Sequence, residues 1–368
     1  MKRGILAITT GISLCGRKEI FLPAFEKYCK EKDGKKIKIL NIGSELLSWL
    51  WEHTREEIPR DNILNADPLT LKILEATVFQ NIKYQLEGWL KENDVVILNF
   101  HMSFEWRNIS LPTLAVLFMK ELISFGLEPD YFFCFIDNAK NILERLKSSR
   151  QWKNQVFSEG DLWKWQNHEV DNTKILTYLF DTKKKFFVMP VMQPPETMYY
   201  LFFEPWRPVI YAQMPISHVT VKELKKVKVF ISQMRKFAVV FDPLTIETGV
   251  VEVDKDNDDA EVRVRSNQTA HRDVNWFIPQ AHGSAAYWVK IVHSSGVADE
   301  TVISSQRGKE TWIIFPADFS SPFMVYRATE NLFKGPEDFL KFFASWSEER
   351  EKDWKERHGA ADGGNDEK

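Results

Sequence analysis

The chain has 368 residues, of which 44% are hydrophobic and 27% are charged, as expected for a globular protein with room for two domains. Its formal net charge of -3 gives no reason to expect a partner among nucleic acids or anionic membranes. No apolar run approaches the roughly 20 residues of a membrane span and no signal-peptide layout opens the chain, so we expect a cytoplasmic protein.

The first half of the sequence alternates short apolar strands with longer helical patterns. This alternation is typical of a parallel sheet with crossover helices. The expected strands cover residues 4–9, 37–42, 95–100, 131–136 and 186–189. The expected helices include residues 21–31, 69–91 and 111–125. We therefore predict a first α/β domain over residues 1–192.

A stretch rich in proline, residues 193–207, is expected to be a linker, and a second α/β alternation follows it over residues 208–350. Its expected strands are residues 208–212, 238–241, 284–289 and 311–315, and its expected helices are residues 221–236, 269–280, 297–306 and 336–346. The tail, residues 351–368, is charged and then rich in glycine, which predicts disorder. The predicted fold class is α/β, with two domains that each hold a mostly parallel sheet between helices on both faces.

The first expected strand leads directly into a glycine loop with the spacing G-x-x-x-x-G, formed by Gly11 and Gly16. Such a loop, followed by a helix N-terminus, allows backbone N–H groups to surround a phosphate. Arg17 stands where the lysine of a phosphate loop is expected, and Lys18 replaces the hydroxyl that would bind Mg²⁺. The sequence therefore predicts an anion site that lacks its metal ligand, or a simple strand-to-helix turn.

Further along the chain, Asp137 ends a strand, and Arg145 and Arg150 follow in a basic helical stretch. Over residues 4–190 this layout resembles nucleoside-monophosphate kinases, the archaeal adenylate kinases especially. The resemblance implies a nucleotide site in which Gly11, Gly16 and Arg17 match the phosphate loop, and the two later arginines match the lid. ATP or another nucleotide is then the expected ligand of this domain.

The second candidate site lies around residues 271–300. An apolar strand runs from Ser284 and leads to Ser294-Ser295-Gly296, where a helix is expected to begin with Ser295 as its N-cap. Small residues at that point offer a phosphate site. Glu300 and Asp273 flank the strand, and two carboxylates at one anomeric carbon can cleave a glycosidic bond.

This pattern resembles the nucleoside 2-deoxyribosyltransferase superfamily, and within it the 2'-deoxynucleoside 5'-monophosphate N-glycosidases, over residues 208–325. The shared motif runs Asp, strand, Ser-x-Gly-Val-x-x-Glu. The resemblance implies Glu300 as nucleophile, Asp273 as acid/base residue, and a sugar and phosphate pocket. That pocket would consist of Tyr211, Met214, Ser217, Ser294, Ser295 and Gly296. The sequence departs from the family where Thr301 follows Glu300.

No metal site is expected. The acidic run that begins at Asp254 starts like a calcium loop, but Asp259 and Arg265 stand at its glycine and glutamate positions. The eight histidines form no H-x-x-x-H pair, and the three cysteines form no CxxC pair.

The leading hypothesis is an enzyme that hydrolyses or transfers the N-glycosidic bond of a nucleotide and requires no cofactor. The alternatives are a nucleotide kinase, and a sensor that binds nucleotides without turnover. The resemblance also implies a homodimer or higher even oligomer built through residues 208–325. Trp276, Phe277 and Trp288 are the expected interface aromatics.

Overall fold

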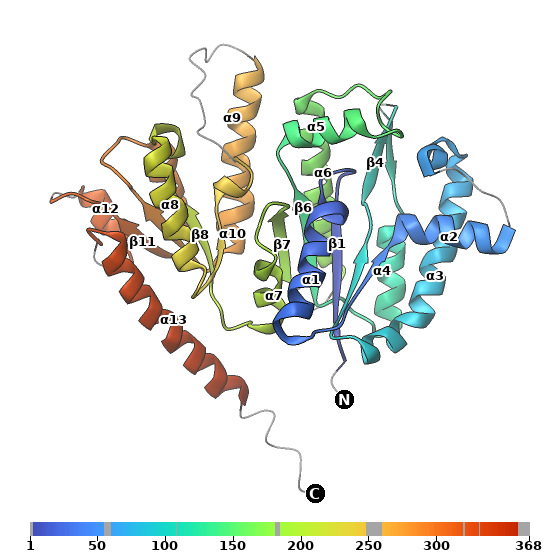
Figure 1. Cartoon of the computed structure of the whole chain (residues 1–368), viewed down its shortest axis with the longest axis horizontal. Coiled ribbons are helices and arrows are strands. Elements are labelled where there is room, and N and C mark those ends of the chain that lie inside the picture. Colours follow the sequence, from blue (N-terminus) through green and yellow to red (C-terminus); the bar gives the residue numbers. More distant parts are fainter. Residues whose placement is uncertain are drawn as a thin grey trace, which may run out of the picture. The chain divides into compact units, whose positions relative to one another are not determined.

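The computed structural model describes residues 3–54, 60–107, 109–180, 185–247, 260–318, 321–330 and 332–359. The chain divides into two compact units, Met1–Pro195 and Glu196–Lys368. Each unit contains a parallel sheet with helices on both faces, so the fold class predicted from the sequence is confirmed (Figure 1). Within the described ranges, no helix has the length and apolar character of a membrane span.

The sheet of the first unit has the strand order β2-β3-β1-β6-β7, and all its strand pairs are parallel. Their bounds are β1 (Ile5–Gly11), β2 (Ile37–Asn41), β3 (Val95–Asn99), β6 (Tyr131–Ile136) and β7 (Lys185–Pro190). Every residue of β3 and β6 is buried, which explains their continuous apolar sequences. The chain passes from β1 to one side of the sheet and from β3 to the other, so the loops after these two strands border a ligand-binding crevice.

The main helices of this unit connect the strands and cover the sheet. They are α1 (Leu22–Asp33), α2 (Ile42–Thr54), α3 (Pro68–Glu92), α4 (Ala115–Ser124), α5 (Ala139–Ser148) and α6 (Glu159–Thr177). A short π-helical turn, η1 (Arg17–Phe21), lies between the glycine loop and α1.

The helix predicted over residues 111–125 begins later than expected. Residues Ile109–Pro112 form strand β5, which pairs antiparallel with β4 (Ser103–Trp106), and α4 begins only at Ala115. The start of α4 is fixed by Glu75 of α3, because its Oε1 accepts a hydrogen bond from Leu114 N at 3.0 Å. The spacing of apolar residues could not predict this start, because it depends on Glu75, a residue distant in sequence.

The second unit has the strand order β11-β10-β8-β9, again with parallel pairs throughout. Its strands are β8 (Val209–Gln213), β9 (Val239–Phe241), β10 (Gly283–Tyr287) and β11 (Glu310–Ile314). Its helices include α8 (Val221–Met234), α9 (Ala260–Arg272), α10 (Ile278–Gln280), α11 (Ser295–Gln306), α12 (Pro322–Arg327) and α13 (Pro336–Gly359). The order reverses between β8 and β10, where open α/β sheets bind ligands beyond the carboxyl ends of their strands.

Two segments expected to be irregular are helical. Helix α7 (Glu196–Phe203) lies within the expected linker and buries Met198, Tyr199 and Leu201, so its apolar content outweighs the flanking prolines. Helix α13 continues through residues 351–359 of the expected disordered tail. The indole of Trp354 packs on Trp206 with ring centroids 5.5 Å apart, which holds this part of the helix against its own unit. Residues 360–368 lie outside the described part of the chain.

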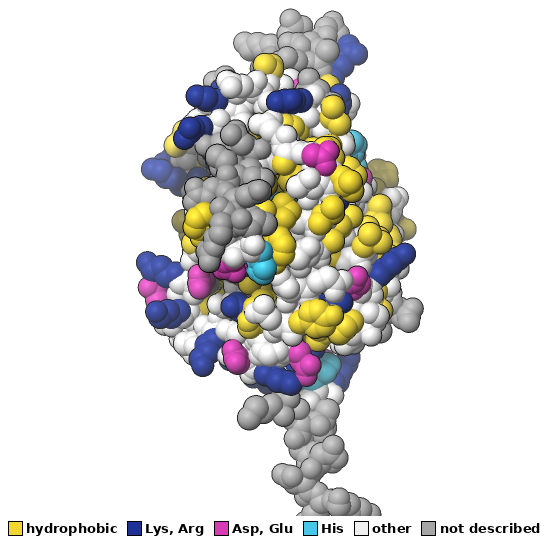
Figure 2. Space-filling model, turned by 90° about the vertical axis from the view of Figure 1, so that its right-hand side faces the viewer, with side chains coloured by type: hydrophobic (Ala, Val, Ile, Leu, Met, Phe, Trp, Pro, Cys, Tyr) yellow, Lys and Arg dark blue, Asp and Glu magenta, His cyan; other side chains and the backbone are white. Residues whose placement is uncertain are grey.

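Figure 2 shows hydrophobic side chains gathered on one face of the molecule. In the first unit, exposed apolar side chains come from α3, the β4-β5 hairpin and α4, and include Leu69, Ile73, Ile109 and Leu117. Contiguous apolar patches on protein surfaces often mark contact sites.

Candidate functional site

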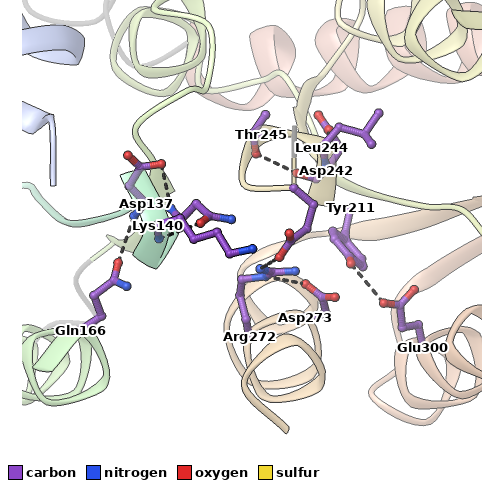
Figure 3. A network of polar contacts seen from close by, with 12 residues as sticks. Asp137, Lys140, Gln166, Tyr211, Asp242, Leu244, Thr245, Arg272, Asp273 and Glu300 are labelled. Atoms are coloured by element: carbon purple, nitrogen blue, oxygen red, sulfur yellow. Dashed lines mark hydrogen bonds and ion pairs between the residues drawn. The ribbon is translucent and has the colours of Figure 1, made fainter. Parts of the chain in front are cut away.

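Tyr211 of β8 and Glu300 of α11 form a hydrogen bond in the second unit. The Tyr211 hydroxyl donates to Glu300 Oε1 at 3.1 Å, and Figure 3 shows the two side chains facing each other. Tyr211 is fully buried on a strand that pairs with β10, and α11 is the helix that follows β10. The fold therefore brings together two predicted site residues at the point where the strand order reverses.

Asp273 lies at the first position of a π-helical turn, η5 (Asp273–Phe277), between α9 and α10. Its neighbour Arg272 donates from Nε to Asp273 Oδ1 at 3.0 Å and from Nη1 to Glu247 Oε1 at 3.1 Å. One guanidinium thus joins two carboxylates beside Tyr211. Single π turns inside helices are frequent at functional sites, because they redirect one side chain without ending the helix.

Both predicted carboxylates have raised pKa values. Burial raises the pKa of Glu300 well above its ordinary value, and the charge of Asp273 raises it further. Burial also raises the pKa of Asp273, while Arg272 opposes this by stabilising the ionised form. Since Arg272 favours the charged form of Asp273 more than that of Glu300, the ligand-free site keeps its proton on Glu300. Such perturbed carboxyl pairs are typical of acid/base and nucleophilic sites.

The residues expected to hold sugar and phosphate lie on the loop after β8 and at the start of α11. Helix α11 begins one residue earlier than expected: Ser294, not Ser295, is the N-cap, and its Oγ accepts from Val297 N at 3.5 Å. Ser295 and Gly296 are exposed in the first turn. A Cβ built on Gly296 meets no atom within 4 Å, so the backbone there is open to a ligand.

The other two predicted contacts follow β8. Met214 is buried, whereas Ser217 is exposed in the short 3-10 turn η3 (Ile216–His218). Because β8 and β10 are parallel neighbours, the segments that follow them begin at the same edge of the sheet. The turn η3 after β8 and the N-terminus of α11 after β10 therefore start from that edge. The structure brings Tyr211, Asp273 and Glu300 together, with the predicted phosphate residues on adjoining segments.

In the first unit, the glycine loop has the backbone conformation that its glycines allow. Gly11 and Gly16 have φ values of 146° and 95°, and Leu14 adopts a positive φ of 58° between them. Arg17 is buried at the start of η1, and Lys18 Nζ donates to Ser44 Oγ of α2 at 2.9 Å. The two cations therefore have different environments: Arg17 is buried, and Lys18 is bound to the neighbouring helix α2.

The two predicted lid arginines differ in position. Arg145 of α5 donates from Nη1 to the Leu14 carbonyl oxygen at 2.6 Å and forms an ion pair with Asp137. It therefore supports the glycine loop from behind. Arg150 is exposed and follows the end of α5. The structure brings Gly11, Gly16, Arg17 and Arg145 together and leaves Arg150 outside this group.

A cavity of about 250 Å³ adjoins the loop. It is lined by loop residues, among them Gly16, Arg17 and Lys18, by the segment after β3, and by side chains from α2, α3 and the β4-β5 hairpin. This is the crevice expected from the strand order.

Several site residues gave no recognisable signal in the sequence. Arg272 favours the ionised form of Asp273 and also binds Glu247, which opposes it, yet only Arg272 is adjacent to Asp273 in sequence. Glu169 of α6 accepts hydrogen bonds from Gly11 N, Met102 N and Ser103 N at 3.1, 2.8 and 3.2 Å. Burial raises the pKa of Glu169 to about 7. Its position in a helix far from the loop gave no local pattern by which it could be found.

The aromatic residues expected at an oligomer interface are instead buried inside the second unit. Trp276, Phe277 and Trp288 are 7%, 0% and 3% exposed. Phe277 packs against Tyr211 and Phe241, with centroids 5.8 and 6.0 Å apart. These aromatic side chains therefore belong to the core of the second unit. The prediction that they form an oligomer interface is wrong. The oligomeric state itself stays a prediction, which light scattering on the full chain would test.

The acidic run that begins at Asp254 lies in residues 248–259, outside the described residues. Among the residues that the structure describes, no three His, Cys, Asp or Glu side chains are grouped so that they could hold a metal ion.

No family model and no curated protein matches the chain. Among solved structures, shikimate kinase from Bacteroides thetaiotaomicron is similar at 11% identity and a TM-score of 0.31, covering 55% of this chain and 97% of that one. The protein APE1195 is similar at 14% identity and a TM-score of 0.29, covering 55% and 96%. Likeness at this level carries no inference about activity.

Proposed function

We propose that the second unit cleaves the N-glycosidic bond of a nucleoside monophosphate. The observation that carries the proposal is the hydrogen bond of 3.1 Å between Tyr211 and Glu300, with Asp273 beside the same hydroxyl. Two carboxyl groups thus lie around the Tyr211 hydroxyl, near the point where the strand order of the sheet reverses. N-glycosyl cleavage needs two such groups, because one attacks the anomeric carbon while the other moves protons.

The reaction divides into two steps. In the first, the Glu300 carboxylate attacks C1' of the sugar, the C1'–N bond breaks, and the leaving base takes a proton from Asp273. In the second, water attacks C1' of the glycosyl ester, its proton returns to Asp273, and Glu300 leaves as a carboxylate. A second base in place of water would give transfer instead of hydrolysis.

The resting protonation favours a role for Tyr211 in this sequence. Glu300 must lose its proton before it can attack, whereas Asp273 must hold one. The Tyr211 hydroxyl contacts both carboxyls, so it can donate its proton to Asp273 while it accepts one from Glu300. Asp273 as nucleophile and Glu300 as acid is the alternative assignment, and the ion pair between Arg272 and Asp273 favours it.

The start of α11 is suited to the 5'-phosphate. Free N–H groups and the helix dipole favour an anion at the first turn of a helix. Ser294, Ser295 and Gly296 occupy that turn, and Glu300 lies further along the same helix. A nucleotide bound by its phosphate here would therefore extend its sugar toward Tyr211.

The test is release of free base by the full chain from a panel of ribo- and deoxyribonucleoside 5'-monophosphates, resolved by chromatography. Glu300→Gln is expected to reduce release by about 10³-fold or more, since a carboxamide forms no glycosyl ester. Asp299→Asn is the matched control, because this exposed carboxylate neighbours Glu300 on α11. Base release at wild-type rates in Glu300→Gln, or none from any nucleotide in the parent, contradicts the proposal.

The identity of the nucleophile is decided separately. Acid quenching during turnover, followed by peptide mass spectrometry, should find the sugar phosphate on the peptide that contains Glu300. A label on the peptide that contains Asp273 would exchange the two roles and leave the reaction class unchanged.

A further inference from the structure

Two nitrogens of the buried Arg17 guanidinium have no hydrogen-bond partner among the residues that the structure describes. Arg17 is 4% exposed, and the two atoms, Nε and Nη1, are themselves buried. Burial lowers the pKa of Arg17 from its ordinary value, yet a guanidinium stays charged at physiological pH. A buried charge is stable only with compensating contacts, so these two N–H groups indicate a binding site for an anion.

Two carboxyl groups among the described residues act on the charge of Arg17, and neither is bonded to Nε or Nη1. Glu169 has the larger effect of the two, and its oxygens accept from the backbone of Gly11, Met102 and Ser103. Glu19 is exposed and itself lines the cavity. The thiols of Cys15 and Cys134 also interact with Arg17, but burial raises the pKa of both, so they are neutral.

The cavity of about 250 Å³ beside Arg17 is lined mostly by apolar side chains rather than by charged ones. Arg17 and Lys18 come from the loop after β1, and Lys72 and Glu75 of α3 form an ion pair with each other at the wall. The rest of the wall, from α2, α3, the β4-β5 hairpin and the segment after α5, is largely apolar. It includes Ile42, Leu47, Leu71, Phe104, Leu111 and Trp152. A ligand that fits has one compact anionic group and an uncharged body of modest size.

Polar groups within the cavity favour a body with hydrogen-bonding edges. Asn99 and Gln151 line it, and so does His101, whose Nδ1 donates to the Gly11 carbonyl oxygen at 2.6 Å. Burial first and the charge of Arg17 second lower the pKa of His101 to about 3, so the ring is neutral. Since Nδ1 carries the proton, Nε2 is an acceptor that suits an amino or hydroxyl group.

We propose that this cavity binds a nucleoside monophosphate without a metal ion, with its phosphate on Arg17 and the glycine loop and its nucleoside against the apolar wall. The cavity lies below the roughly 300–1,000 Å³ of ordinary ligand pockets, which favours one phosphate over three. Lys18, bound to Ser44, occupies the position where a magnesium-binding hydroxyl would stand. This site is independent of the chemistry proposed for the second unit.

The experiment is calorimetric titration of the full chain with nucleoside monophosphates in the presence of EDTA. Glu300→Gln serves as the background, so that no nucleotide is consumed. Adding Arg17→Met is expected to weaken one binding component by about 10- to 100-fold, as loss of charge-assisted hydrogen bonds does. Lys120→Met, which changes an exposed cation on α4, is the control and should bind as the parent does.

Ligand-free Arg17→Met should melt no lower than its parent, because an apolar side chain of similar length removes a buried unpaired charge. Should it fail to fold, Arg17→Lys keeps a charge without the planar fork and should still weaken the same component. Base release by Arg17→Met in the wild-type background should be unchanged.

Three results would overturn the proposal: nucleotide binding that is indifferent to Arg17, equally tight binding of inorganic phosphate to the same component, or a strict preference for a magnesium triphosphate. Failure of the proposed glycosidase is distinguishable from these. It would appear as no base release by the parent chain while the component that depends on Arg17 persists.

Discussion

Arg272 Nε lies 3.0 Å from Asp273 Oδ1, so two consecutive residues form an ion pair at the point where α9 passes into the π turn η5. Consecutive residues on a regular helix point in different directions. Asp273 is therefore held beside Tyr211 by its own neighbour, and the same guanidinium also binds Glu247.

Arg272→Met should destabilise the second unit by about 3–5 kcal/mol, because removing one partner leaves two carboxylates without their cation in a buried place. Adding Asp273→Asn should restore part of the loss, since the second change removes one of these charges. Thermal unfolding of both variants measures the effect. Arg307→Met, at an exposed position after α11, is the control and should stay within about 0.5 kcal/mol of the parent. Equal melting of Arg272→Met and the control would contradict the buried ion pair.

Tyr211→Phe should reduce base release by about 10- to 100-fold while the chain keeps its fold, because the change removes one hydroxyl from a buried ring. The loss should appear in kcat more than in KM if Tyr211 positions the proton between the two carboxyls. Tyr287→Phe is the matched control: this buried tyrosine is on the neighbouring strand β10 and should leave both constants unchanged. A purely structural role for Tyr211 would instead lower stability and leave kcat intact.

The strands and most of the helices were predictable because apolar periodicity is a local property. The continuous apolar run of β6 predicted its bounds correctly, at Tyr131–Ile136. The pairing of Glu300 with Asp273 was also suggested by local pattern, since strand, serine turn and helix occur in order along the chain. Their convergence on Tyr211 depends on the parallel pairing of β8 with β10, which the sequence implies only through the fold.

What the sequence could not reveal depends on contacts between distant segments. Glu169 reaches the glycine loop from α6, and Glu247 reaches Arg272 from beyond β9. Arg145 was expected to reach over the phosphate, yet it binds the carbonyl oxygen of Leu14. A charged residue in a helix has the same local pattern whether it faces water, a ligand or a carbonyl group.

The raised pKa of Glu300 makes stability depend on pH. A carboxyl whose pKa is higher in the folded state than its ordinary value near 4.5 stabilises the fold while protonated, and this contribution is lost as pH rises toward the folded pKa. Ligand-free wild type should therefore lose stability relative to Glu300→Gln from about pH 4.5 upward. Melting temperatures across this range, measured for both proteins, provide the comparison.

Glu223→Gln gives a control of opposite sign. A backbone hydrogen bond from Thr220 and a hydrogen bond from Lys290 lower the pKa of Glu223 to about 2, so its contribution is present above pH 4.5 and is lost as pH falls toward 2. A difference between Glu300→Gln and wild type that does not change with pH would show that Glu300 keeps an ordinary pKa.

Gly16→Ala and Gly88→Ala should shift stability in opposite directions. Gly16 has a φ of 95°, and a Cβ there would lie 3.0 Å from Val191 Cγ2 and 3.1 Å from Arg145 Nη1. The new methyl group is strained by its backbone and displaces the arginine that supports the loop, so we expect a loss of about 1–3 kcal/mol together with weaker nucleotide binding in the first unit. Gly88 is exposed within α3, and a Cβ there meets nothing within 4 Å, so Gly88→Ala should gain about 0.5–1 kcal/mol through helix propensity. Unfolding curves of the two variants, with calorimetry of nucleotide binding, test the pair. If Gly16→Ala bound nucleotide as the parent does, the position of the loop would not matter for binding, and Arg145 would have no part in forming the site.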